Sequence, residues 1–222
     1  MKKIILNSAL ITFVALSYTS CKEKNKDEAL QEISEVAEAT AEASGFSVDV
    51  AKSEISWKGQ KPTGTHNGTI KLSSGIVAAV NGELQAGTFT IDMNSIANLD
   101  LDGDMKASLE NHLKGTVEGK EGDFFDVTKY PTATFELTGV EDENGNITVK
   151  GNLTIKDKTN PVAFPAVVSF TDDTMTLKSS PFMIDRTKWG VNYGSKTIFG
   201  DLGDKFINDE IELVIQLYAT KV

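Results

Sequence analysis

The sequence predicts an all-β protein whose antiparallel strands form an extended barrel with one short capping helix. Beyond residue 45, apolar and polar residues alternate with a period of two, which is typical of half-buried strands. Turn-forming pairs, Asn81-Gly82, Asn144-Gly145 and Asp172-Asp173, separate neighbouring runs. Only the segment 105–113 has helical spacing, with apolar residues four apart. Because so few residues are helical, the strands must bury their apolar faces against one another.

The strands can do this either by closing into a barrel or by packing as a two-sheet sandwich. Tight turns between long strands favour the barrel, because a sandwich more often has Greek-key crossings. The inward positions follow from the alternation, and further strands are expected at 69–72, 166–170, 175–177, 182–185 and 211–218. The clearest inward residues are Ile55, Trp57, Phe89, Ile91, Met93, Ala133, Phe135, Leu137, Leu153 and Ile155.

The start of the chain is expected to lie outside this domain. Lys2 and Lys3 precede an apolar run at 4–16, which is sized like a signal-peptide core and too short to span a bilayer. The stretch LSYTSC resembles the lipobox of bacterial lipoproteins, with Tyr18 in place of the usual aliphatic residue. We expect residues 1–20 to be a lipoprotein signal peptide and Cys21, the single cysteine, to be lipidated. An ordinary secretory signal is the alternative.

Residues 21–45 form an acidic tether, helical or disordered, with a thin apolar stripe at Leu30, Ile33 and Val36. The domain follows at 46–222. Its glycine-rich loop at 115–122 is expected to lie at the barrel mouth and to tolerate shortening. Phe124 and Phe125 are expected to anchor the capping turn.

Composition excludes several functions. The formal net charge of -10 and the pI near 4.7 disfavour nucleic acid as a partner. With only two histidines the chain cannot build a His-rich zinc site, and the calcium-like stretch at 100–104 lacks the downstream glutamate. His112 with Asp123 or Asp126 could supply a base, yet no activated nucleophile accompanies it. We therefore predict no catalytic residue, metal or cofactor, and hence no enzyme.

Three blocks, NHLKG followed by GDFFDVTKYPTATFEL, then GNLTIKDKTNPVAFP and FMIDRTKWGVNY, resemble the signatures of the YceI-like polyisoprenoid-binding family. The resemblance implies a lipocalin-like barrel whose lumen holds a long isoprenoid chain, of the polyprenyl quinone or polyprenyl phosphate type. Two departures are the longer loop at 115–122 and Asp157, where the family often has glycine.

The expected function is that of a membrane-anchored carrier or storage lipoprotein in the cell envelope. The expected location is the outer membrane, facing the periplasm, and surface exposure is the alternative. A structural or adhesive lipoprotein without ligand, or an enzyme acting on a lipid, are the competing functions. Arg186 is either a contact for the lipid head group or a structural ion pair with Asp185, Asp201 or Asp204. The residues expected to line the ligand are Trp57, Phe89, Ile91, Phe135, Leu137, Leu153, Ile155, Phe170, Leu177 and Phe182.

The anchor leads to the first prediction. Cys21→Ser should move the protein from the detergent-extracted membrane to the soluble exported fraction, because acyl chains on that residue would be the membrane attachment. Cell fractionation with mass spectrometry of the N-terminal peptide measures this. A mutant that stays in the membrane, together with a wild-type peptide free of acyl chains, would contradict the lipoprotein interpretation.

Overall fold

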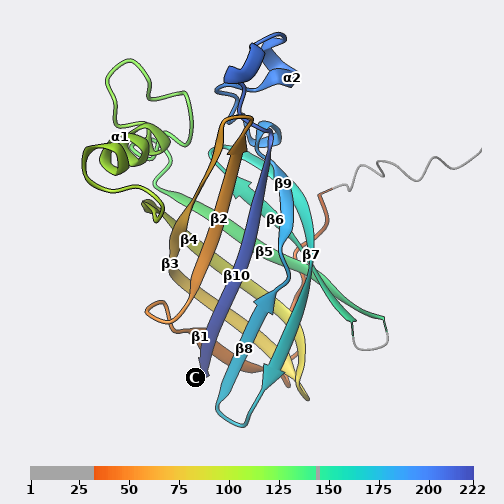
Figure 1. Ribbon diagram of the computed structural model, residues 1–222. Coiled ribbons are helices and arrows are strands. Elements are labelled where there is room, and N and C mark those ends of the chain that lie inside the picture. The colour runs from red at the N-terminus through yellow and green to blue at the C-terminus, as the bar shows by residue number, and fades with distance from the viewer. Residues whose placement is uncertain (1–32, 144–145) are drawn as a thin grey trace, which may run out of the picture. The chain divides into compact units, whose positions relative to one another are not determined.

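The computed structural model describes residues 33–143 and 146–222 (Figure 1). The predicted signal peptide, Cys21 and the Asn144-Gly145 turn lie outside these residues. The elements in chain order are β1 (Ser44–Val48), β2 (Glu54–Lys61), β3 (Gly64–Val80), β4 (Glu83–Asn98), α1 (Gly103–Lys114), β5 (Thr132–Glu143), β6 (Asn146–Ile155), β7 (Lys158–Phe170), β8 (Thr174–Ser179), β9 (Phe182–Asp185), the 3-10 helix η1 (Arg186–Trp189), α2 (Lys196–Phe199), the 3-10 helix η2 (Gly203–Lys205) and β10 (Glu210–Lys221).

The strands close into an antiparallel barrel. They pair in the order β10-β2-β3-β4-β5-β6-β7-β8, and β8 pairs again with β10. On β10, Leu213 lies opposite Trp57 of β2, and Leu217 lies opposite Leu177 of β8. β9 pairs with the start of β10, whereas β1 pairs with its end and with β3. The predicted barrel is confirmed, and the sandwich alternative is wrong.

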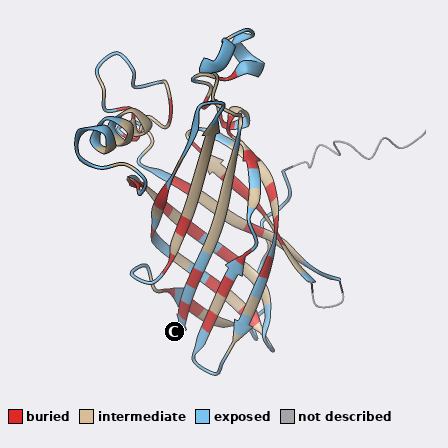
Figure 2. Cartoon of the chain, in the orientation of Figure 1, coloured by how far each residue is buried: buried red, intermediate tan, exposed pale blue. Residues whose placement is uncertain are grey.

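The alternation in the sequence places the core inside this barrel. Phe89 of β4, Phe135 of β5 and Leu153 of β6 lie side by side across three neighbouring strands. The Phe89 and Phe135 ring centroids are 6.2 Å apart, within the range of favourable aromatic pairs. Buried residues alternate with less buried ones along the strands (Figure 2). The predicted turn at Asn81-Gly82 is also confirmed, with both residues at positive φ, as a tight hairpin requires.

One end of the barrel, called the mouth from here on, carries α1 and the segment 186–209 with η1, α2 and η2 (Figure 1). The C-terminus lies at the opposite, far end. The predicted capping helix is thus confirmed as α1. Sequence analysis missed α2. Its N-cap is Ser195, whose hydroxyl accepts a hydrogen bond from the Ile198 N–H at 3.2 Å. Four residues are too few to produce a helical pattern.

The described part of the tether is extended and lies against the barrel. The Ala37 N–H donates to the Leu137 carbonyl at 2.8 Å, and the Asn152 amide donates to the Ser34 carbonyl at 2.7 Å. Ile33 and Val36 of the apolar stripe are exposed. The helical alternative is therefore wrong for residues 33–43, which contain no helix and only one turn, where the Ala43 N–H donates to the Thr40 carbonyl at 3.1 Å. Leu30 lies outside the described residues. No helix in the described ranges is long and apolar enough to cross a membrane.

The loop after α1 has a fixed base and an exposed tip. Gly115 ends the helix at φ 71°, and its N–H donates to the His112 carbonyl at 3.1 Å. A Cβ at this position would lie 2.5 Å from the Glu121 carbonyl oxygen. The base is anchored further by Phe125, whose N–H donates to the Leu113 carbonyl at 3.1 Å. Residues 118–120 are exposed.

Deletion of residues 118–120 should therefore leave the melting temperature nearly unchanged, because the length of a surface loop changes its closure entropy only slowly. Gly115→Ala should lower the unfolding free energy by at least about 1 kcal/mol, because the left-handed conformation disfavours a Cβ. Thermal and urea denaturation followed by circular dichroism measure both. If the deletion lowers the melting temperature strongly, or if Gly115→Ala leaves the unfolding free energy unchanged, the loop is not held at its base.

Candidate functional site

The barrel encloses an apolar lumen that begins with an inner cavity. Every side chain lining this cavity is a hydrocarbon or a thioether, and its volume is about 70 Å³. The lining residues are Ile55, Leu72, Val77, Leu84, Ala86, Gly87, Phe89, Ile91, Phe135, Leu137, Val149, Leu153, Val162, Phe164, Met175, Leu177, Phe182, Leu213, Ile215 and Leu217. A surface of this kind attracts hydrocarbon and offers no partner to a polar group.

The lumen continues toward the mouth through two further cavities. The middle cavity, of about 90 Å³, shares Ile55, Ile91, Leu153 and Leu213 with the inner one. The mouth cavity, of about 250 Å³, shares Trp57, Leu113, Phe125, Arg186, Val191 and Ile211 with the middle one. The three cavities therefore adjoin one another along the barrel. The mouth cavity is the largest of the three, and most of the polar side chains that line the lumen lie there.

Most of the predicted lining residues lie along these cavities. Phe89, Ile91, Phe135, Leu137, Leu153, Leu177 and Phe182 line the inner cavity, and Trp57 and Ile155 line the middle one. Phe170 does not line any of the three cavities. It packs edge-on against Phe46 of β1, with ring centroids 5.5 Å apart. The placement of Phe170 in the lining is therefore corrected, because β1 supplies a partner that strand alternation alone does not reveal.

Sequence reasoning also missed part of the wall. Phe125, assigned to the capping turn, lines both the middle and the mouth cavities. β10 contributes Leu213, Ile215 and Leu217, which were detectable only as part of the nearly continuous apolar run at 211–218. Phe164 and Val162 of β7 lie in a stretch broken by two prolines, Pro161 and Pro165, which obscured the alternation.

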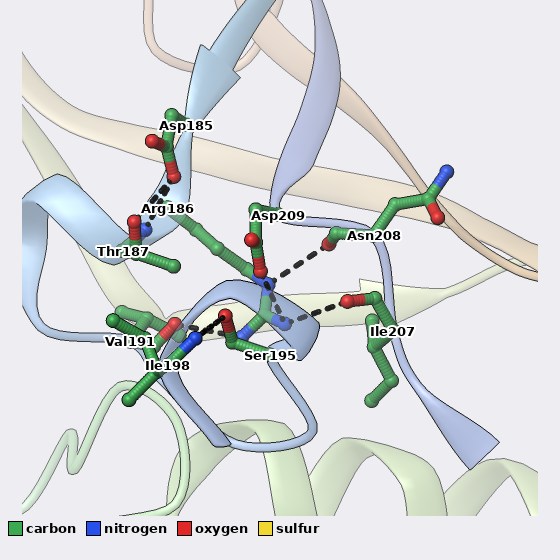
Figure 3. A network of polar contacts seen from close by, with 9 residues as sticks. All are labelled: Asp185, Arg186, Thr187, Val191, Ser195, Ile198, Ile207, Asn208 and Asp209. Carbon is green, nitrogen blue, oxygen red and sulfur yellow. Dashed lines mark hydrogen bonds and ion pairs between the residues drawn. The ribbon is translucent and has the colours of Figure 1, made fainter. Parts of the chain in front are cut away.

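Arg186 is almost fully buried and its guanidinium group is already bonded (Figure 3). Its Nε, Nη1 and Nη2 groups donate to the carbonyls of Asn208, Val191 and Ile207 at 3.1, 2.6 and 3.1 Å. Its ion-pair partner is Asp209, with 3.5 Å between Nη2 and Oδ1. Burial lowers the pKa of Arg186 below its ordinary value, and the negative charges of Asp209 and Asp185 oppose that shift.

The bonds of Arg186 hold the segment 186–209, which forms one side of the mouth. The expected ion pair exists, but its partner is Asp209 instead of Asp185, Asp201 or Asp204. Asp185 caps η1, where its carboxylate accepts from the Thr187 N–H at 2.9 Å and from the Thr187 hydroxyl at 2.6 Å. Arg186 still borders the middle and mouth cavities. Its role as a head-group contact stays a prediction, and its geometry here is that of a structural clamp.

The two histidines bind carboxylates near the mouth. His112 Nε2 lies 2.7 Å from Asp123 Oδ2, and the rings of Phe124 and Tyr193 pack against the imidazole with centroids 5.0 and 4.8 Å away. His112 thus joins α1 to the following loop through Asp123 and to the segment 186–209 through Tyr193. The imidazole of His112 is held in place by one carboxylate and two aromatic rings, an arrangement typical of a structural contact.

Asp100, in the calcium-like stretch, is held by protein donors. Its oxygens accept from the Asn67 N–H at 2.8 Å and the Asn98 amide at 2.6 Å, and His66 Nδ1 lies 2.8 Å away. Burial raises the pKa of Asp100, but these hydrogen bonds outweigh it and leave the pKa below its ordinary value. In the described ranges, no group of three or more His, Cys, Asp or Glu side chains is placed to hold a metal ion.

Comparison with known proteins identifies the relatives of this chain. The model of the YceI-like domain matches residues 46–219. A UPF0312 protein of Vibrio cholerae is 36% identical over 83 residues, which cover 36% of this chain and 44% of the relative. One from Shewanella sp. strain MR-4 is 33% identical over 108 residues, or 48% of this chain and 55% of the relative. The chain thus matches about half the length of these curated relatives.

Two solved structures share the fold. The crystal structure of Burkholderia cenocepacia BcnA has a TM-score of 0.61 at 27% identity, covering 78% of this chain and 99% of that one. A polyisoprenoid binding domain from Saccharophagus degradans, implicated in plant cell wall breakdown, has a TM-score of 0.55 at 14% identity, covering 80% and 98%. At that identity the second likeness establishes the architecture alone.

The clamp leads to a prediction about Arg186. Arg186→Met should lower the unfolding free energy by about 3–5 kcal/mol, because it leaves Asp209 and three carbonyls without their donor. Urea denaturation measures this, and Lys188→Met, at an exposed cation on the same 3-10 helix, is the matched control. A variant that keeps its stability but loses bound lipid would show instead that Arg186 acts on the head group.

Proposed function

The chain belongs to the YceI-like family, and on that basis we propose that it binds a long-chain isoprenoid lipid, of the polyprenyl quinone or polyprenyl phosphate type, in its barrel lumen. The observation that carries the proposal is the series of three adjoining cavities inside the barrel, the innermost of which is lined only by apolar side chains. The description of the Saccharophagus degradans domain as polyisoprenoid binding supports the same ligand class.

The energetics of burial favour such a ligand. Burying a CH₂ group contributes about 0.8 kcal/mol, so an isoprene unit of five carbons contributes on the order of 3–4 kcal/mol before the cost of ordering the chain. A few units within the lumen suffice for stable binding. Hydrocarbon contacts supply affinity but little selectivity, which leaves recognition of the head group to the wider, more polar mouth.

The proposed setting is the cell envelope. A lipid anchor at Cys21 would hold the protein at a membrane, with the outer membrane facing the periplasm as the proposed location. The barrel would then act as a carrier or store that keeps an insoluble chain out of water. No step of this role requires catalysis. A structural lipoprotein without ligand is the competing proposal, and it predicts a lumen that stays empty of lipid.

Narrowing the inner cavity provides the test. Leu137→Trp should abolish or reduce at least tenfold the binding of a polyprenyl quinone and a polyprenyl phosphate, because Leu137 is buried at the wall and a larger ring would occupy the path of the chain. Binding of each purified, labelled lipid to detergent-free protein, measured by co-sedimentation, gives the readout.

Val167→Trp is the matched control, because Val167 is highly exposed on the outside of β7. It should bind both lipids as the wild type does. Circular dichroism checks that each variant folds. Wild-type protein that binds neither lipid at micromolar concentration would refute the carrier role and favour the structural one.

A further inference from the structure

Trp57 bears a buried hydrogen-bond donor without a partner at the boundary between the middle and mouth cavities. Its indole Nε1 is inaccessible to solvent and has no hydrogen-bond partner among the described residues. The side chain lines both cavities. Its ring lies close over Gly68, where a Cβ would come within 2.6 Å of Cζ2. The absence of a side chain at residue 68 therefore makes the room that the indole occupies.

The other tryptophan, Trp189, is a structural indole whose N–H has a hydrogen-bond partner. Trp189 is buried, and its Nε1 donates to the Leu153 carbonyl at 2.9 Å. A buried donor left unpaired costs about 1–3 kcal/mol, so native proteins rarely retain one without a reason. An indole nitrogen is a donor only and carries no charge. The group that would satisfy Trp57 is accordingly an acceptor brought by the ligand.

The neutral indole donor itself favours an uncharged acceptor. Arg186 borders the same two cavities, but its donors are bonded to backbone carbonyls and its charge is offset by Asp209. Because Arg186 and Asp209 form an ion pair, the two charges largely offset each other, and Arg186 is not free to bind an oxyanion. A phosphate carries about -1.5 to -2 charges at neutral pH, and a neutral N–H cannot offset the cost of desolvating them.

We propose that the indole N–H of Trp57 donates a hydrogen bond to an uncharged oxygen of the lipid, of the carbonyl kind found on a quinone ring, and so selects such head groups over phosphate. This inference rests on the proposed function, because it needs an isoprenoid tail in the lumen. It adds the residue that recognises the head group. Hydrocarbon contacts along the inner cavity would hold the tail in every case.

Three ligands with comparable isoprenoid tails separate the contributions of head and tail: a polyprenyl benzoquinone, a polyprenyl monophosphate and a polyprenyl hydrocarbon without oxygen. Trp57→Phe keeps an aromatic ring but removes the donor. Its Kd for the quinone should be about 3- to 10-fold weaker than that of wild type, while its Kd for the hydrocarbon should change less than twofold. In the wild type, the quinone should bind more tightly than the phosphate.

Nuclear magnetic resonance of ¹⁵N-labelled wild type gives a second readout that does not depend on the variant's folding. The chain has two tryptophans and hence two indole N–H signals. The Trp57 proton signal should move downfield when the quinone is added, and the Trp189 signal should stay in place. Trp189 serves as the internal control because its N–H already has a carbonyl partner.

The outcomes separate this inference from the proposed function. If the hydrocarbon and the quinone bind equally to wild type and variant, or the Trp57 signal stays unmoved at saturating quinone, Trp57 does not recognise the ligand. A phosphate that binds wild type as tightly as the quinone would overturn the proposed selectivity. If none of the three ligands binds, the proposed function fails, and this inference fails with it.

Discussion

Closure of the sheet by β10 is the constraint on which the rest of the structure depends. This strand pairs with β2 and β1 on one side and with β8 and β9 on the other, so the strands in the ring have no free edge. Once the ring is closed, the apolar face of every strand points into the same enclosed space. That space must either be filled by side chains or hold an apolar ligand, and the adjoining cavities are consistent with the second arrangement.

The chemistry of the lumen changes along its length. Near the far end the wall is purely apolar, and Phe46 and Phe170 pack together there. Toward the mouth, polar side chains enter the wall, but Arg186 is engaged with the backbone of residues 191–208 and holds that segment in place. Hydrocarbon contacts thus lie in the inner part of the lumen and polar groups lie near the mouth. The buried cation, Arg186, stabilises the fold.

The sequence was sufficient to predict the barrel and most of its inward positions, because alternation reports directly on a sheet with one buried face. It could not show that Phe170 packs against β1 and does not line a cavity, because that contact depends on the path of β1. The partner of Arg186 was also out of reach: Asp209 lies 23 positions away along the chain and is brought near by the pairing of β9 with β10. The sequence also could not show that the indole N–H of Trp57 lacks a partner, because strand alternation does not reveal which side-chain groups form hydrogen bonds.

The central claim is that the lumen carries an isoprenoid lipid in the cell, and the most direct test is native mass spectrometry of the full-length protein purified from its own membrane, followed by extraction and identification of the bound lipid. The account predicts a mass increment that disappears on extraction and matches one polyprenyl lipid per barrel. Protein that is folded, isolated without displacing detergent and free of any long-chain lipid would contradict it.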